Sequence, residues 1–136
     1  MSAEDREILV AYRLEQADEA LQVADMLLVS GVFRTVVNRS YYAMFYAVLA
    51  LFAARQEGTS KHSGVIGLFD REFVKTGLID REFSAWLHEA FDLRQRADYR
   101  EMFTVSKERA EEVSENARQF VEAARTHLAA HPTPTS

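Results

Sequence analysis

Two groups of side chains in this sequence have the types and spacing that could bind an anion or a nucleobase. They are Arg39, Tyr42 and Tyr46 in one segment, and Arg94, Asp98 and Tyr99 in another. A guanidinium forms forked hydrogen bonds that suit phosphate, and an aromatic ring offers a face on which a base can stack. In this interpretation Arg94 holds a phosphate, Asp98 orients Arg94 or a ribose hydroxyl, and the aromatic rings contact the base.

Both groups also have simpler explanations. Tyr42 and Tyr46 are four residues apart and Arg39 lies three before Tyr42, so one face of a helix would carry all three. A core helix whose tyrosine hydroxyls form local hydrogen bonds has the same pattern. Arg94 and Asp98 could be an ion pair on an exposed helix end, which would contribute only about 0.3–0.5 kcal/mol. Spacing alone leaves both interpretations open.

An all-α fold must position these residues. Apolar side chains recur at steps of three and four, the two prolines lie in the C-terminal tail, and there is no alternating strand pattern. The expected helices span about residues 4–29, 33–55, a short third segment that follows a connection at 59–62 and ends near 75, then 80–99 and 106–130. Gly31 and Gly77 are expected to end the first and third helices. Asp80 is expected to cap the fourth helix, and Thr104 or Ser106 to begin the fifth.

These segments predict one α-helical bundle over residues 1–130, with a disordered tail at 131–136. The length of 136 residues and a hydrophobic content of 48 % suffice for one real core. The absence of cysteine excludes disulfides and thiolate chemistry. The four histidines (His62, His88, His127 and His131) are not expected to form a metal site, and no cofactor is expected.

The charge and hydropathy pattern also narrows the class of protein. A net charge of −5 argues against a general nucleic-acid binder but permits a local basic cleft. The apolar run that ends at Ala54 is shorter than the roughly 20 residues that a membrane-spanning helix needs. The N-terminus is acidic and lacks the apolar segment of a signal peptide. A soluble cytoplasmic protein is therefore expected.

Three stretches carry a resemblance to a known family. They are Arg39-Ser40-Tyr41-Tyr42-Ala43-Met44-Phe45-Tyr46-Ala47, then 61–66 with 73–77, then 90–94 with 97–99. Together they resemble the HEPN family (higher eukaryotes and prokaryotes nucleotide-binding), in particular its short stand-alone prokaryotic members. The resemblance spans roughly residues 35–100.

The resemblance implies an up-and-down helical bundle that often dimerises and pairs with a small nucleotidyltransferase in toxin–antitoxin-like systems. Many members are metal-independent RNases, whose motif is an arginine followed after four to six residues by a histidine. Arg94 matches the arginine and Gln95 the polar residue that often follows it, whereas Tyr99 takes the place of the histidine. Tyrosine, with a pKa near 10, is a poor general base at pH 7.

Three functions therefore remain open at this point. The first is a toxin–antitoxin-like component that binds nucleotide or RNA in a polar groove. The second is an active RNase toxin in which Tyr99 or His62 replaces the motif histidine, and the third is a module that only docks a partner protein. The resemblance also implies a homodimer with a shared groove, and the fifteen aromatic residues suggest more aromatic surface than a small bundle must bury.

Overall fold

The computed structural model of the chain describes residues 2–55, 62–99 and 102–132, and of residues 62 and 63 only the backbone. These residues form five α-helices and one π-helical turn and contain no strand, so the expected all-α fold is confirmed. The elements are α1 (Ala3–Ser30), α2 (Phe33–Arg55), α3 (His62–Phe69), η1 (Asp70–Val74), α4 (Arg81–Tyr99) and α5 (Lys107–Ala130).

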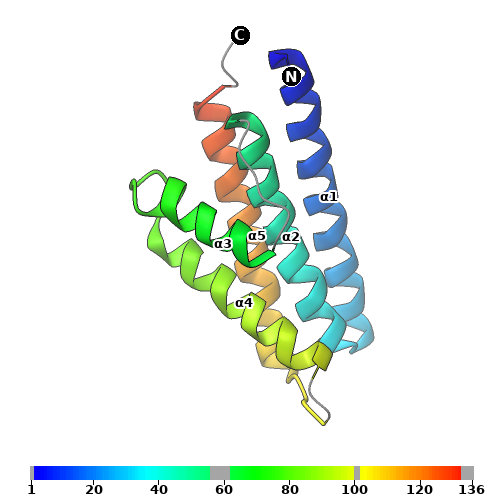
Figure 1. Cartoon of the computed structure of the whole chain (residues 1–136). Helices are drawn as coiled ribbons and strands as arrows, with labels where there is room; N and C mark the ends of the chain where they lie inside the picture. Colours follow the sequence, from blue (N-terminus) through cyan, green and yellow to red (C-terminus); the bar gives the residue numbers. More distant parts are fainter. Residues whose placement is uncertain (1, 56–61, 100–101, 133–136) are drawn as a thin grey trace.

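Helix α2 lies at the centre of the bundle and packs against α1, α4 and α5. Figure 1 shows α1, α2 and α5 as the long helices, with α3 and α4 on one side of them and the start of α1 at the same end of the bundle as the end of α5. Helix α1 runs antiparallel to α5, because Asp25 pairs with Arg118 at 2.9 Å and Asp18 pairs with Arg125 at 2.7 Å. In Figure 1 the helices α1, α2, α4 and α5 alternate in direction along the chain, as an up-and-down bundle requires.

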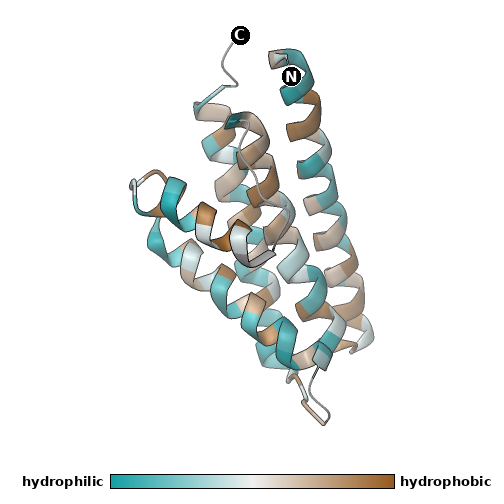
Figure 2. Cartoon of the chain, in the orientation of Figure 1, coloured by the Kyte–Doolittle hydropathy of each residue, from teal (hydrophilic) through white to brown (hydrophobic). Residues whose placement is uncertain are grey.

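The central position of α2 follows from its composition. It is long and apolar enough to pass as a membrane-spanning helix by length and hydropathy, but 72 % of its most apolar window is buried inside the protein. Five of its side chains have at most 1 % of their surface exposed, namely Tyr41, Met44, Ala47, Val48 and Leu51. Figure 2 shows that α1, α4 and α5, unlike α2, carry many hydrophilic residues between their hydrophobic ones. Helix α2 is thus the core of the fold.

The helix ends follow the predicted capping residues. Gly31 has a positive φ of 79°, and its backbone N–H donates to the carbonyls of the last turn of α1. The Asp80 carboxylate accepts a hydrogen bond from the Glu82 N–H at 2.9 Å. Of the two candidates for the start of α5, the cap is Ser106, whose hydroxyl accepts from the Arg109 N–H at 3.1 Å. These caps satisfy backbone groups that a helix end leaves unpaired.

The third helical segment differs from the expectation of one regular helix ending near Lys75. It starts at His62, which was assigned to the preceding connection, and it changes at Asp70 into a π-helical turn. Asp70 accepts a hydrogen bond from Ser84 on α4 at 2.6 Å, while Phe73 remains fully buried. The wider turn allows the carboxylate to reach α4 without removing the phenylalanine from the core. Residues 59–61 of the expected connection and 133–136 of the expected tail lie outside the described residues.

The two glycines at positions 31 and 67 provide a matched test of the turn after α1. A Cβ atom would meet nothing within 4 Å at either position, but only Gly31 has a positive φ. Gly31→Ala should therefore lower the free energy of unfolding by about 1 kcal/mol through backbone strain. Gly67→Ala, inside α3, should be neutral or stabilising by up to about 1 kcal/mol. Urea denaturation followed by circular dichroism measures both, and equal losses in the two variants would contradict this account of the turn.

Candidate functional site

The contact between α2 and α4 brings together most of the polar residues that the sequence singled out. Tyr42 lies opposite Arg94, whose Nη2 donates to the Tyr42 hydroxyl at 3.2 Å. Asn38 lies one turn before Tyr42 on α2, and Asp98 lies one turn after Arg94 on α4. Asn38 Nδ2 donates to Asp98 Oδ2 at 3.5 Å. The two helices are therefore antiparallel at this contact. We call the surface formed by Asn38, Arg39, Tyr42, Arg94 and Asp98 the α2–α4 groove.

Arg94 is held in place mainly by aromatic rings. Its guanidinium carbon lies 5.3 Å from the centroid of Tyr41 and 5.2 Å from that of Tyr42, within the range of cation–π contacts. Its side chain is only 14 % exposed, and Nε lies 3.4 Å from Asp98 Oδ2. That ion pair lacks hydrogen-bond geometry, because the buried Nε has no hydrogen-bond partner. Arginine has five N–H donors, so Arg94 keeps donors that the hydrogen bond to Tyr42 does not use.

Arg39 brings a second positive charge to the same tyrosine. Its guanidinium carbon lies 5.0 Å from the Tyr42 centroid, and its Nε and Nη2 both donate to Asn38 Oδ1, at 3.1 and 2.9 Å. The acceptor is a neutral amide, and no carboxylate of the described residues forms an ion pair with Arg39. Two guanidinium groups thus approach one ring with only Asp98 as a paired negative charge. Such an arrangement favours an anion as a further partner.

Tyr41 lies beneath Arg94 and is fully buried. Burial raises the pKa of its phenol to about 12, although the positive charge of Arg94 acts in the opposite direction. The Tyr41 phenol is therefore neutral near pH 7 and supports Arg94 rather than accepting protons.

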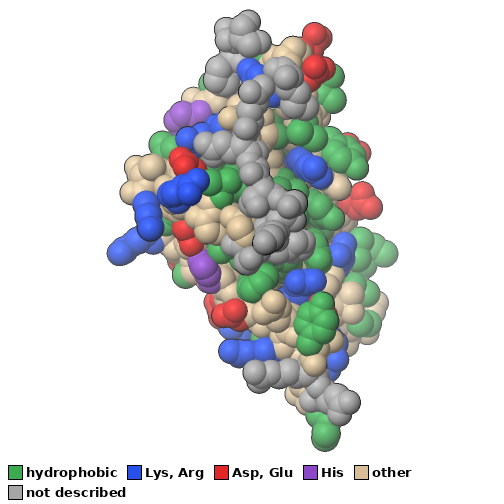
Figure 3. All heavy atoms as spheres, in the orientation of Figure 1, with side chains coloured by type: hydrophobic (Ala, Val, Ile, Leu, Met, Phe, Trp, Pro, Cys, Tyr) green, Lys and Arg blue, Asp and Glu red, His purple; other side chains and the backbone are tan. Residues whose placement is uncertain are grey.

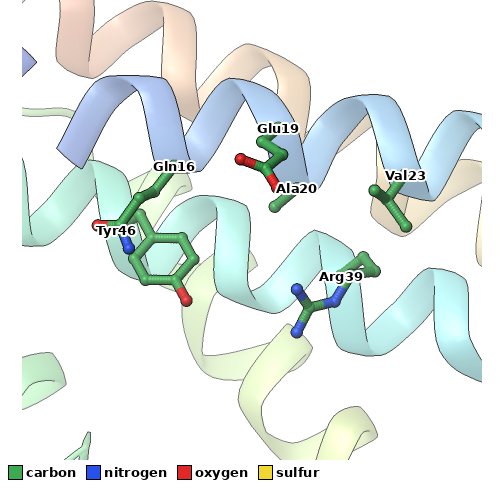
Figure 4. A pocket seen from close by; sticks show the side chains of 6 residues that line it. All are labelled: Gln16, Glu19, Ala20, Val23, Arg39 and Tyr46. Atoms are coloured by element: carbon green, nitrogen blue, oxygen red, sulfur yellow. The ribbon is translucent and has the colours of Figure 1, made fainter. Parts of the chain in front are cut away.

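Tyr46 connects the groove to a small hollow between α1 and α2. Its ring lies 6.0 Å from that of Tyr42. The hollow holds about 110 Å³ and is lined by Gln16, Glu19, Ala20, Val23, Arg39 and Tyr46. Figure 4 shows the four α1 side chains facing Arg39 and Tyr46 on α2. Arg39 thus borders both the hollow and the α2–α4 groove.

Tyr99 is the one proposed site residue that lies apart from the others. It is 76 % exposed at the end of α4, and five residues place it about 140° around the helix from Arg94. It lines a shallow polar hollow with Asp92, Gln95 and Arg96 instead. The structure therefore brings together Arg39, Tyr42, Arg94 and Asp98, places Tyr46 beside them, and separates Tyr99 from them.

Sequence reasoning did not identify two residues of the site. Asn38 links Arg39 to Asp98, and its spacing of four residues before Tyr42 was the available signal. Tyr41 forms the inner surface under Arg94, but a tyrosine in an apolar run gives no separate indication of this role.

Two of the histidines have a spacing that could suit a metal site, although no metal site was predicted from the sequence. His127 and His131 are four residues apart, and their rings stack with centroids 4.1 Å apart. Within the described part of the chain, no three His, Asp or Glu side chains gather in a way that could hold a metal ion.

The face of the molecule in Figure 3 shows Lys and Arg side chains interspersed with Asp and Glu. There is no broad basic surface on this face of the kind that general nucleic-acid binders present. The positive charge of the α2–α4 groove is accordingly a local feature of an acidic protein.

Comparison with known proteins gives consistent matches over almost the whole chain. The HEPN domain model matches residues 10–127. A UPF0332 protein of Thermotoga maritima is 37 % identical over 119 residues, which cover 88 % of this chain and 90 % of the relative. A protein of Methanocaldococcus jannaschii that is named as a candidate toxin is 35 % identical over 115 residues, covering 85 % of this chain and 78 % of the relative. A UPF0332 protein of Archaeoglobus fulgidus is 32 % identical over 113 residues, covering 83 % of this chain and 90 % of the relative. This chain therefore belongs to the HEPN family.

Proposed function

We propose that this protein is a toxin-like HEPN component that binds the phosphate of a nucleotide or RNA in the α2–α4 groove. The observation that carries the proposal is the incomplete pairing of two converging arginines. Arg94 donates one hydrogen bond, to Tyr42, and both hydrogen bonds of Arg39 go to the neutral Asn38. A phosphate can accept several charge-assisted hydrogen bonds from such guanidinium groups.

The toxin-like role draws on the relatives. Two proteins of Methanocaldococcus jannaschii that carry the name of candidate toxins are 35 % and 34 % identical to this chain. The family resemblance of the sequence further implies a small nucleotidyltransferase as the partner. A homodimer whose groove draws on both subunits is part of the same proposal.

The aromatic content gives little support for that dimer, because the bundle covers most of it. Among the residues that the structure describes, Tyr12 and Tyr99 are the only strongly exposed aromatic ones. A better indication is the outer surface of α1, where Ile8 is 64 % exposed, Met26 68 % and Val29 91 %. Exposed apolar side chains on one helix are typical of an interaction surface.

The geometry favours binding over RNA cleavage. The residue in the place of the motif histidine, Tyr99, lies about 140° around α4 from Arg94, so the two do not face the same part of a substrate. The side chain of His62, the other candidate replacement, lies outside the described residues. The interaction-module alternative requires no phosphate in the groove and is separated from the proposal by the following measurement.

Arg94→Lys tests the groove with the positive charge retained. Lysine keeps the charge but loses the forked donors and the contact with the tyrosine rings, so the affinity for 5′-AMP should fall by about tenfold or more. Isothermal titration calorimetry of the wild type and the variant measures the change. Arg96→Lys is the matched control, because Arg96 is exposed on another face of α4 and its substitution should leave the affinity unchanged. Equal affinities of wild type and Arg94→Lys would contradict the proposal.

The proposed assembly is tested on the purified full chain. Light scattering at micromolar concentration should give a mass near twice the 15.5 kDa of one chain. Met26→Glu should shift the protein toward the monomer, because it places a charge on the exposed surface of α1. A wild-type mass of one chain would contradict the homodimer.

Co-expression with the adjacent gene product, followed by a pull-down, tests the nucleotidyltransferase partner, which should co-purify with the chain.

A further inference from the structure

The hollow between α1 and α2 has its own pattern of donors and acceptors. Gln16 and Glu19 lie on one side, Tyr46 lies on the other, and Ala20 and Val23 supply the apolar part of the lining. Its volume of about 110 Å³ is well below the roughly 300 Å³ of a small ligand pocket. It can therefore take one flat group rather than a whole nucleotide.

The amide of Gln16 has a fixed orientation. Its Oε1 accepts a hydrogen bond from Arg13 Nη1 at 2.9 Å, which leaves the amide N–H groups free to donate. Figure 4 shows the amide nitrogen beside Tyr46. Gln16 therefore presents a hydrogen-bond donor to the hollow.

Glu19 presents the complementary acceptors. It lies three residues after Gln16 on the same face of α1, and no cation of the described residues lies within ion-pair distance of its carboxylate. Its oxygens are therefore available to two neighbouring N–H groups of a ligand. The lining thus offers one donor followed by a pair of acceptors.

We propose that this hollow is a base subsite that selects guanine. The Watson–Crick edge of guanine has an acceptor at O6 followed by donors at N1 and N2, which matches Gln16 and then Glu19. Adenine places an acceptor at N1, and uracil has carbonyl oxygens on both sides of N3–H, so both would bring a lone pair against the Glu19 carboxylate. Tyr46 supplies an aromatic surface for the base.

Arg39 connects this subsite to the phosphate. It lines the hollow and also lies over Tyr42, where Arg94 is found. A guanine nucleotide would place its base by α1 and its phosphate between the two arginines. The inference rests on the proposed function, since it assigns the base of the ligand whose phosphate the groove holds.

Calorimetric titrations of the full chain with 5′-GMP, 5′-IMP and 5′-AMP test the subsite. GMP should bind about tenfold more tightly than AMP, because a bidentate contact discriminates bases by that order. IMP, which lacks the 2-amino group, should lie between them. Glu19→Gln should bring the ratio of the GMP and AMP affinities close to one. The matched control Glu15→Gln, one turn earlier on α1 and outside the hollow, should retain the wild-type ratio.

The outcomes separate this inference from the proposed function. If Arg94→Lys lowers the affinities for GMP and AMP alike while the wild type shows no preference for GMP, the phosphate site in the groove is supported and the guanine subsite is wrong. The subsite is also wrong if Glu19→Gln keeps the wild-type ratio, or if wild type does not bind GMP. If the preference for GMP depends on Glu19 but Arg94→Lys leaves both affinities unchanged, the guanine subsite is supported and the proposed phosphate site in the groove is wrong.

Discussion

The guanidinium of Arg94 lies against two tyrosines of the central helix, and this contact constrains how α4 can cross α2. The Arg94 side chain is only 14 % exposed, so its charge carries a desolvation cost. The protein offsets this cost with the rings of Tyr41 and Tyr42, the Tyr42 hydroxyl and the carboxylate of Asp98. The tyrosine partners lie on α2 and are in place only when Tyr42 faces Arg94. A shift of α4 by one turn would leave the buried guanidinium without its hydrogen bond to Tyr42 and without its contacts with the two rings, whereas Asp98, on the same helix, would stay beside it. The register of the two helices therefore depends on a polar contact in an otherwise apolar core.

The same contact accounts for the chemistry of the site. The aromatic rings fix the guanidinium without using its hydrogen-bond donors, and Arg39 adds a second fixed cation through the same tyrosine. Because the two cations are already held in place, binding an anion does not carry the entropy cost of ordering two long side chains. The net charge of −5 means that the protein as a whole does not attract phosphate, so that attraction to an anion depends on the local charge of this groove. Such a site suits recognition of one nucleotide better than tracking along a long nucleic acid.

Much of the fold could be predicted because its signals are local. The apolar run that begins after Gly31 identified α2, and the small residues at steps of three and four identified α5. The π-helical turn was not predictable, since it depends on Asp70 reaching Ser84 and His88 on another helix.

For the site, the spacing of Arg94 and Asp98 correctly indicated a pair on one face of α4. Tyr99 was grouped with them by sequence proximity, although five residues turn a helix to a different face. Gln16 and Glu19 carried no signal, because which face of α1 meets the tyrosine stripe of α2 is decided by packing.

The central claim is that Arg39 and Arg94 hold one phosphate together, and nuclear magnetic resonance of the arginine side chains tests it most directly. In a sample with labelled arginine, addition of 5′-AMP should shift the Nε–H signals of Arg39 and Arg94 with the same dependence on concentration. Adenosine, which lacks the phosphate, should leave both signals in place, and the exposed Arg96 should not respond to either compound. Signals of Arg39 and Arg94 that stay unmoved by AMP, or that move equally with adenosine, would contradict the account.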